Sequence, residues 1–327
     1  MNLKQQYCAR THASIPIILK CGHGARVWDI DGNEYIDFLC AISVVNQGHC
    51  HTRIVNAILE QGQQLAICTS AFQNEYYPRL CKRVCELLGY DVAASMSSSS
   101  EAADLAMKIV RKLGYDVKGI KSHDGKAFLP NVGSEIAGVP VRFNFISDIK
   151  RAFETAGADV AAIIIEYMQG YEGCVSAELR YIKAVSNLCQ KHNILFIADE
   201  IQAGFGHVGT LMAYSHELIK PDMVVLGKVL TGGHYSMSMV LGNRSVMTQI
   251  KPGQHSPTFA ANSVASPVAI AVTDVVGLVT AGRLSGLMLK RGLIAIPSEN
   301  RVRLAPPVDI DIVEKAVHDL ACGARVR

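Results

Sequence analysis

The chain has 327 residues, of which 49% are hydrophobic and 19% charged, enough for one large α/β domain and a smaller one. Its formal net charge is only +3 and it has no basic block, which excludes a nucleic-acid signature. No apolar stretch reaches about 18 residues, so no membrane span is predicted.

The N-terminus and the cysteines indicate the compartment. The first ten residues, MNLKQQYCAR, contain neither the apolar run of a signal peptide nor an Arg/Ser-rich amphipathic stretch. Ten cysteines are scattered without a CxxC pair, and Cys81 and Cys85 lie four residues apart on a predicted helix. This usage is typical of buried or reduced thiols in an intracellular protein. We therefore expect a cytoplasmic protein.

The first part of the chain predicts a hairpin followed by helices. Alternation around an Asp-Gly pair predicts a β-hairpin over 25–39. Helical spacing of apolar residues is found over 51–65, 76–89 and 97–114. The last of these begins with serines followed by Glu101, and we expect Gly114 to end it. Residues 115–139 have neither period and are predicted to be a loop, unusually long for a compact domain.

Strands and helices alternate in the second part. Apolar strands are predicted at 139–145, 160–166, 194–200 and 223–227. Helices are predicted at 147–157, 178–191, 262–280 and 311–321. Because the strands are nearly continuous apolar runs, the pattern favours a mostly parallel sheet with helices on both faces. The fold class is therefore α/β.

Two of these strands end in charged residues followed by Gly-rich turns. Asp199 lies near the end of the strand ILFIADE (194–200), and Lys228 directly follows the strand MVVLG (223–227). Either residue alone has an ordinary interpretation, as a carboxylate that caps a turn or as a solvated lysine. Together at neighbouring strand ends they are the groups that pyridoxal 5'-phosphate (PLP) chemistry needs, an amine for a Schiff base and a carboxylate for the pyridine nitrogen.

Nearby residues fit the same cofactor. Ile201 could pack on a ring face, and Gln202 could hydrogen-bond the ring hydroxyl. The helix that starts near 97 offers amides and a positive dipole end for a phosphate, together with the hydroxyls of Ser98, Ser99 and Ser100. The alternative for these serines is a helix cap without a ligand.

Four phrases carry a resemblance to a known family: VVNQGHCH (44–51), GYDVKGI (114–120), IKPGQH (250–255) and RLAPP (303–307). With the Asp199/Lys228 pair they resemble class III aminotransferases, nearest to ornithine aminotransferases, over almost the whole chain. The resemblance implies the fold type I PLP-transferase architecture. It divides the chain into an N-terminal segment (1–50), a large PLP-binding domain (51–270) and a shortened C-terminal small domain (271–327).

The resemblance also implies a reaction and further site residues. Ornithine would give its δ-amino group to 2-oxoglutarate, which yields glutamate semialdehyde and glutamate. Arg303 matches the family arginine that grips a substrate carboxylate, although an ion pair with a surface acid is its ordinary alternative. Thr258 matches a threonine that reaches the phosphate of a partner subunit, which implies a homodimer with shared active sites. Family members are often mitochondrial, so the matrix is the alternative location.

The chain departs from the family pattern at several positions. A ring-stacking aromatic and a strand are missing from the region 115–139, where Phe128 is the only nearby aromatic, and this loss should leave neighbouring strands with unpaired backbone groups. The serine turn lacks its usual glycine, and Pro257 stands where a serine donor is usual. A gating glutamate corresponds to Tyr171, with Glu172 one place along.

Further departures affect substrate binding and the C-terminal domain. Two substrate tyrosines of the family fall at Ile42 and at about His12, and a long helix and small sheet of the C-terminal domain are absent. Three interpretations therefore stay open: an active ornithine aminotransferase, an impaired or inactive homologue that acts as an interaction partner, and an incomplete gene product.

Overall fold

The structure is a computed structural model of the chain. It describes residues 6–9, 15–37, 39–68, 71–116, 127–128, 134–136, 138–156, 159–170, 174–178, 180–208 and 210–278. None of the helices in these ranges is both long and apolar enough to cross a bilayer.

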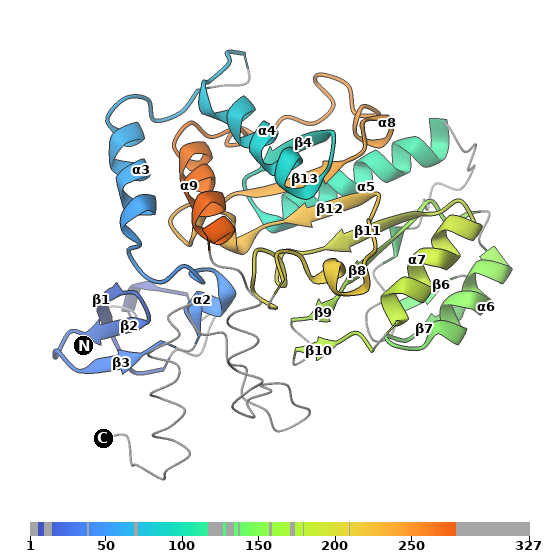
Figure 1. The fold of residues 1–327 in the computed structure, drawn as a ribbon, viewed down its shortest axis with the longest axis horizontal. Helices are drawn as coiled ribbons and strands as arrows, with labels where there is room; N and C mark the ends of the chain where they lie inside the picture. Colours follow the sequence, from blue (N-terminus) through green and yellow to red (C-terminus); the bar gives the residue numbers. More distant parts are fainter. Residues whose placement is uncertain are drawn as a thin grey trace, which may run out of the picture.

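A six-stranded mixed sheet forms the centre of the molecule (Figure 1). In spatial order its strands are β4 (Val92–Met96), β13 (Ser238–Gly242), β12 (Met223–Leu226), β11 (Leu195–Asp199), β8 (Ala162–Glu166) and β5 (Ala127–Phe128). β12, β11, β8 and β5 are mutually parallel, whereas β13 is antiparallel to both of its neighbours. The expected parallel core is confirmed for β8, β11 and β12, whereas β5 and β13 were not anticipated from the sequence. The predicted strand at 139–145 is not part of this sheet. Only β7 (Val139–Val141) is a strand there; it pairs antiparallel with β6 (Ser134–Ile136), and the chain then turns at Asn144, whose φ is 67°.

Helices cover both faces of the sheet. The covering helices are α4 (Tyr76–Leu88), α5 (Ser99–Asp116), α6 (Ile146–Ala156), α7 (Tyr181–Lys191), α8 (Arg244–Met247) and α9 (Ala265–Leu278). Because successive strand residues point to opposite faces, Ile197 packs with α5 while its neighbours Phe196 and Ala198 pack on the other side with α7 and α4. α5 and α8 therefore cover one face, and α4, α6, α7 and α9 cover the other.

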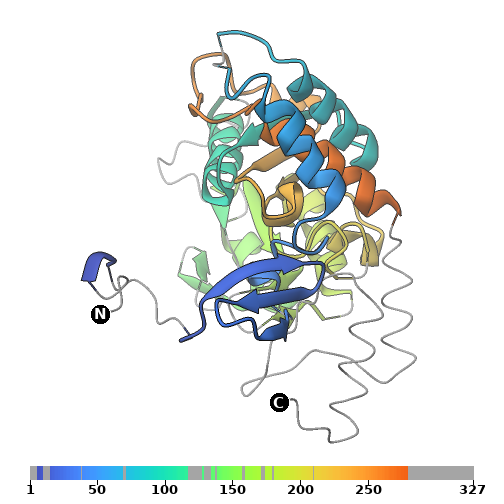
Figure 2. The same cartoon turned by 90° about the vertical axis from the view of Figure 1, so that its left-hand side faces the viewer.

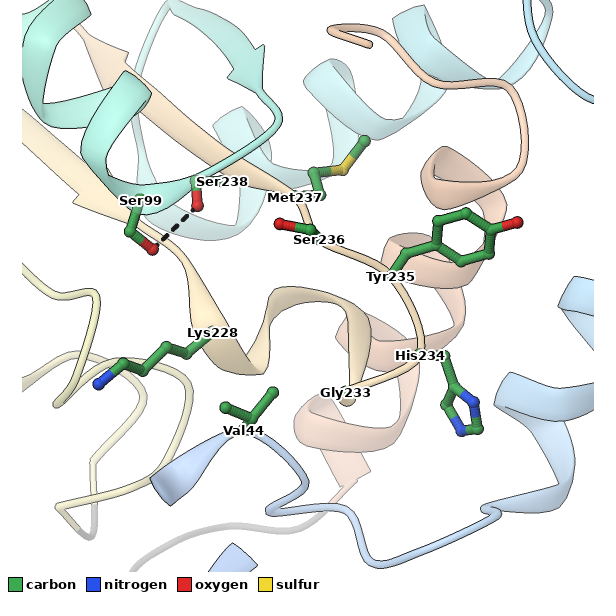
Figure 3. A pocket seen from close by; sticks show the side chains of 9 residues that line it. All are labelled: Val44, Ser99, Lys228, Gly233, His234, Tyr235, Ser236, Met237 and Ser238. Carbon is green, nitrogen blue, oxygen red and sulfur yellow. Dashed lines mark hydrogen bonds between the residues drawn. The ribbon is translucent and has the colours of Figure 1, made fainter. Parts of the chain in front are cut away.

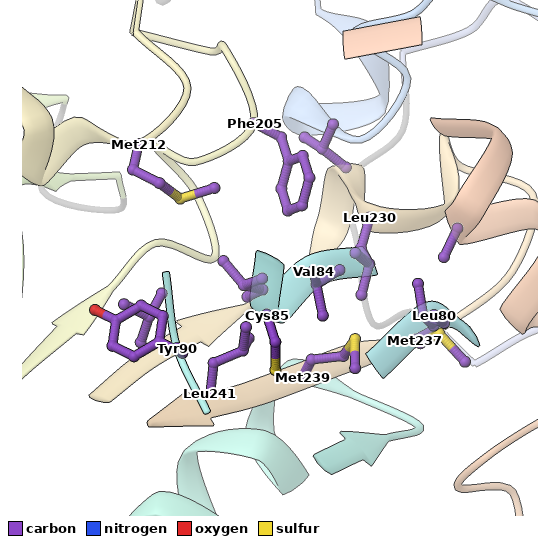
Figure 4. Close-up of a cluster of buried hydrophobic side chains, with 14 of the residues drawn as sticks. Leu80, Val84, Cys85, Tyr90, Phe205, Met212, Leu230, Met237, Met239 and Leu241 are labelled. Carbon is purple, nitrogen blue, oxygen red and sulfur yellow. The ribbon is translucent and has the colours of Figure 1, made fainter. Parts of the chain in front are cut away.

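The α4 and α9 side holds a large apolar cluster (Figure 4). Leu80 and Val84 of α4 are fully buried there against Met239 and Leu241 of β13. α3 (Thr52–Gly62) lies beside α9, which in turn contacts α4 (Figure 2). Burial of this apolar surface, worth roughly 25 cal/mol per Å², fixes the strand ends that carry the polar residues described below.

An N-terminal three-stranded sheet lies to one side of this core (Figure 1). It consists of β1 (Leu19–His23), β2 (Arg26–Asp29) and β3 (Glu34–Ile36). The turn between β2 and β3 is held by Asp29, whose carboxylate accepts hydrogen bonds from the amides of Asp31 and Asn33, and Gly32 there has a φ of 87°. The predicted hairpin is confirmed, and β1 extends it.

The remaining elements are short turns and strand pairs. They are the turn α2 (Cys40–Ser43), the 3₁₀ helices η2 (Ala213–Glu217) and η3 (Lys228–Thr231), and the strand pairs β6 (Ser134–Ile136) with β7 (Val139–Val141) and β9 (Met168–Gln169) with β10 (Val175–Ser176). The helices predicted at 51–65, 76–89, 147–157, 178–191 and 262–280 are confirmed as α3, α4, α6, α7 and α9. The predicted helix at 311–321 lies outside the described residues.

Two further sequence predictions are wrong. Residues 115–139 are not wholly a loop, because β5 pairs with Ala162 and Ile163 of β8. The backbone of β8 is therefore paired on both sides at these residues, so the expected loss of pairing does not occur there. Gly114 does not end α5, which continues to Asp116. One helical glycine costs only about 1 kcal/mol, and burial of Leu113 with the Lys112–Asp116 ion pair favours the longer helix.

Candidate active site

Asp199 and Lys228 lie at the same edge of the sheet. β11 ends at Asp199, and β12 ends two residues before Lys228. The two strands are parallel neighbours, with Asp199 paired to Val225, so their carboxyl ends meet at one edge. Open α/β sheets bind ligands at this edge. The structure therefore brings together the two residues that the sequence singled out.

Gln202 connects this pair to the following turn. The Lys228 ammonium donates a hydrogen bond to Gln202 Oε1, and Gln202 is buried. A Cβ on Gly170 would lie 2.8 Å from Gln202 Cγ, so only glycine leaves room for this side chain. Within the described chain Gln202 Nε2 is buried without a hydrogen-bond partner, which is costly unless a ligand accepts from it.

The backbone at Lys228 is strained. Its φ of 41° lies in the left-handed region, which a residue with a Cβ adopts at a cost of about 1–2 kcal/mol. The preceding strand β12 is completely buried, and η3 begins at Lys228 itself. Such outliers concentrate at functional sites, where the surrounding structure holds them in place. The strained conformation directs the amine toward Gln202.

Asp199 is an unusual carboxyl group. Burial raises its pKa to about 7, a hydrogen bond from the Ile201 amide opposes the shift, and the nearby Glu166 carboxylate adds to it. The positive charge of Lys228 lowers the same pKa. A buried carboxyl with this pKa would be ionised fully by a cation placed beside it. Asp199 therefore suits a ligand that carries a protonated nitrogen.

Glu200 has a structural role instead. Burial raises its pKa to about 7, and its two oxygens accept hydrogen bonds from the amides of Ala213 and Tyr214 at 3.0 and 2.9 Å. These contacts fix η2 below the site. Of the adjacent acids, Glu200 is thus the one that holds a turn, and Asp199 is the one at the sheet edge.

The serine turn divides its residues between two roles. Ser98 Oγ accepts from the Glu101 amide at 3.2 Å, and the Glu101 carboxylate accepts from the Ser97 and Ser98 amides at 2.8 and 3.1 Å. These reciprocal hydrogen bonds form a capping box. Ser98 is therefore a helix cap, as the alternative without a ligand predicted. Ser99 Oγ instead lies 3.2 Å from Ser238 Oγ of β13, and Ser100 is exposed.

A cavity of about 360 Å³ opens beside Lys228 (Figure 3). Its lining consists of Val44, Ser99, Lys228, Gly233, His234, Tyr235, Ser236, Met237 and Ser238. Of the predicted site residues in the described part of the chain, Ser99 and Lys228 line it. Gln202 is buried, Asp199 and Ile201 are half-buried, and Ile201 packs with the α5 core. The segment 233–238 was missed, and the Gly-Gly turn after Lys228 was its one sequence signal.

Thr258 does not line the cavity of its own protomer. It is exposed in a turn next to Phe259, which is 61% exposed. Its expected contact with a partner subunit stays a prediction. Glu172 and Arg303, the predicted substrate-binding residues, lie outside the described residues, as do Tyr171 and His12. Phe128 belongs to β5 at the far edge of the sheet from β4.

Gly233 is needed where the lining turns back toward β13. Its φ is 82°, and a Cβ there would overlap Val45 Cγ1. We expect Gly233→Ala to lower the free energy of unfolding by about 2–4 kcal/mol, from the left-handed backbone and the overlap together. Gly62→Ala is the matched control, because Gly62 has no atom within 4 Å of an added Cβ and no left-handed φ. Thermal denaturation of both variants measures the difference, and equal midpoints would contradict the prediction.

Comparison with known proteins places the chain in a family. The model of class III aminotransferases matches residues 7–132 and 139–303. The ornithine aminotransferase of Emericella nidulans is 34% identical, and the alignment covers 90% of this chain and 72% of that protein. The probable mitochondrial ornithine aminotransferase of Caenorhabditis elegans is 37% identical, with 90% and 76% covered. This chain therefore spans about three quarters of the length of these relatives.

Solved structures agree with this similarity. The ornithine aminotransferase of Plasmodium yoelii has a TM-score of 0.82 at 34% identity, covering 88% of this chain and 76% of that one. The acetylornithine aminotransferase of Elizabethkingia anophelis has a TM-score of 0.84 at 38% identity, covering 88% and 75%. The fold is thus that of the fold type I PLP-dependent transferases.

The chain belongs to the class III aminotransferase family. Within that family it is an ornithine aminotransferase-like protein, and the family is PLP-dependent. The resemblance drawn from the four phrases and the Asp199/Lys228 pair is confirmed.

Proposed function

We propose that this protein binds PLP and transfers the δ-amino group of ornithine to 2-oxoglutarate, giving glutamate semialdehyde and glutamate. The observation that carries the proposal is the hydrogen bond from Lys228 to the buried Gln202 at the sheet edge where Asp199 also lies. The same arrangement would serve acetylornithine, since a relative of similar TM-score is an acetylornithine aminotransferase. Several ornithine aminotransferases that are 34–38% identical to this chain favour ornithine.

The residues present fit the cofactor. The unpartnered Nε2 of Gln202 offers a donor for a ring oxygen, and Asp199 offers a carboxylate for the ring nitrogen. The Ser99 and Ser238 hydroxyls, close to the start of α5, offer donors for a phosphate. Lys228 reaches the cavity between these groups. These residues supply hydrogen-bond donors, an amine and an acid. Together the three kinds of group match the polar groups of PLP.

In the proposed mechanism each residue has a defined task. When bound, PLP supplies an aldehyde for the substrate amine and an electron-withdrawing ring for negative charge at the reacting carbon. Lys228 Nζ removes the proton from that carbon and returns it as general base and acid. Asp199 holds the proton on the ring nitrogen, and Gln202 Oε1 orients the Lys228 amine. Burial of Gln202 keeps water from its contact with Lys228.

A second candidate is a homologue that binds PLP weakly and turns over slowly or not at all. The observation that favours it is the serine turn, where Ser99 stands in place of the family glycine. Its Cβ and its hydroxyl, 3.2 Å from Ser238 Oγ, take space where the phosphate would bind. The chain covers only about three quarters of the length of these relatives, which also favours the less active homologue. This candidate keeps Asp199, Gln202 and Lys228 in place and differs in rate.

The absorbance spectrum separates the two candidates. The protein purified with PLP is expected to show a band between about 330 and 430 nm that bleaches when ornithine is added and returns with 2-oxoglutarate. A band that no amino donor changes would favour the weakly active homologue. A spectrum without any band, unchanged by excess PLP, would overturn both.

Homodimer formation and a cytoplasmic location are part of the proposal. The exposed Thr258–Phe259 turn supports a contact between protomers. Relatives include mitochondrial proteins, so the location stays a prediction that fractionation of cells would test.

A further inference from the structure

The short turn α2 winds in the left-handed sense. The φ angles of Cys40, Ala41, Ile42 and Ser43 are 49°, 51°, 62° and 65°, and the ψ angles of Ala41 and Ile42 are 41° and 55°. None of the four is a glycine, so each Cβ comes close to a carbonyl oxygen at a cost in free energy. Ile42 is the most unusual of them because it is β-branched. Such residues persist only where the surrounding structure holds them, and they concentrate at functional sites.

Asp37 holds the start of this turn. Its Oδ1 accepts hydrogen bonds from the amides of Leu39 and Cys40 at 2.8 and 3.0 Å. Its Oδ2 lies 2.7 Å from Nε2 of His49, whose backbone forms a bridge with Gly24 between β1 and β2. A hydrogen bond to a charged group corresponds to a factor of roughly ten or more in an equilibrium constant. The contacts of this one carboxylate therefore oppose the strain of the turn.

The end of the turn reaches the cavity. Val44, the residue after α2, lines the cavity together with Lys228, and it lies between Lys228 and Gly233 in Figure 3. Its Cγ1 would be 3.6 Å from a Cβ on Gly233. Asn46 is buried, and its Nδ2 donates to the carbonyl of Phe205 at 3.0 Å, in the loop that follows β11. The conformation of α2 thus sets where Val44 stands in the cavity wall.

We propose that Asp37 is a positioning residue for the proposed reaction. It holds α2 in the left-handed form, and this form keeps the Val44 side chain in the wall beside Lys228. Asp37 is not among the residues that line the cavity, so it acts only through the turn. Without its hydrogen bonds the strain unwinds α2 and Val44 leaves the wall. A substrate bound beside Lys228 then loses an apolar contact and binds more weakly. The inference rests on the proposed function and deepens it.

The ornithine concentration that gives half the maximal rate of bleaching of the PLP band measures this contact. In Asp37→Ala we expect it to rise roughly tenfold, whereas the maximal rate per bound PLP falls less than about threefold, because Lys228 keeps its contact with Gln202. Asp37→Asn keeps an oxygen for the two amides and is expected to stay within about twofold of wild type. Asp31→Ala, which removes an exposed acid from the turn between β2 and β3, is the control.

A purely structural role of Asp37 predicts a different result. It would lower the amount of folded protein and leave the half-saturating ornithine concentration unchanged. An unchanged concentration in Asp37→Ala, or an equal rise in Asp31→Ala, would overturn the inference.

A measurement without turnover separates this inference from the proposed function. Amide hydrogen exchange of the cofactor-free protein reports how often α2 opens, because the amides of Ser43, Val44 and Val45 donate within the turn. We expect these amides to exchange roughly tenfold faster in Asp37→Ala than in wild type or the control variant. Ala41→Gly removes one left-handed penalty, so adding it to Asp37→Ala is expected to slow the exchange again.

The exchange result decides the role of Asp37 whether or not the protein turns over. Exchange that is unchanged in Asp37→Ala would overturn the inference. A missing PLP band with exchange that depends on Asp37 would refute the proposed function and support the hold of Asp37 on α2. Should Asp37→Ala not fold alone, the double variant with Ala41→Gly is compared with Ala41→Gly itself, and the same results decide.

Discussion

Replacing Lys228 with alanine is expected to abolish amino transfer while leaving the fold intact. Lys228 is the amine at the sheet edge, and its removal takes away both the group that bonds to the cofactor and the base that moves the substrate proton. General acid–base catalysis alone contributes about 10²–10⁴-fold, so we expect a loss of at least roughly a thousandfold in turnover. The absorbance band of the lysine-bound cofactor disappears in the same variant. Stopped assays of glutamate formation and the spectrum measure the two effects.

Replacing a second lysine distinguishes the loss of the reacting amine from the loss of one positive charge. Lys220 lies outside the cavity, donates to Gly89 O at 2.5 Å and packs over the Tyr90 ring. Lys220→Ala removes one lysine from the same half of the chain and is expected to retain the band and the turnover. Addition of a small free amine to Lys228→Ala is expected to restore part of the proton transfer. Equal activity in Lys228→Ala and wild type would exclude Lys228 as the reacting amine.

The strain at Lys228 predicts an accompanying change in stability. With a φ of 41° the side chain contributes a left-handed penalty of about 1–2 kcal/mol that alanine retains and glycine relieves. Lys228→Gly is therefore expected to be more stable than Lys228→Ala, with both inactive. Denaturant unfolding of the cofactor-free variants checks the order.

Replacing Asp199 with asparagine is expected to have opposite effects on stability and on function. Burial is the largest cause of the raised pKa of Asp199, about 7, against an ordinary value of 3.8. The folded protein therefore binds this proton more tightly than the unfolded chain does, and stability falls as the pH rises from about 4 to 7. Asparagine carries no charge and keeps the oxygen that accepts from the Ile201 amide. The cofactor-free variant should be about 2–4 kcal/mol more stable than wild type at pH 8, and the difference should shrink toward pH 4.

Function changes in the other direction. Asp199 no longer holds a proton on a ring nitrogen in the variant, so we expect turnover to fall at least about a hundredfold and PLP to bind more weakly. Glu200 also has a pKa of about 7 because of burial, so part of the pH dependence of stability persists in Asp199→Asn. Thermal unfolding at pH 4 to 8, with and without PLP, measures both effects. A variant less stable than wild type at pH 8 without PLP would contradict the burial argument.

Local sequence patterns predicted much of the fold and part of the site. The period of apolar residues located six helices that the structure contains, and apolar runs located β8, β11 and β12. The Ser98–Glu101 spacing predicted a helix start, which is the observed capping box. These predictions succeed because each depends on residues within one turn or one strand.

Contacts between distant segments could not be predicted in this way. β13 is inserted antiparallel between β4 and β12, which places Ser238 against Ser99 from 139 residues away. The short strand β5 was taken for a loop because its two residues have no period of their own, and pairing with β8 defines them.

The sequence by itself determined the family and the positions of Asp199 and Lys228, since a strand that ends in a charged residue is a local feature. Only the tertiary structure decided how these positions are used. The parallel pairing of β11 with β12 placed the two residues at one edge, and the close approach of Gly170 fixed Gln202 against the lysine. The antiparallel pairing of β13 with β12 brought Ser238 to Ser99. Each of these depends on backbone segments meeting in space, for which the spacing of residues along the chain carries no information.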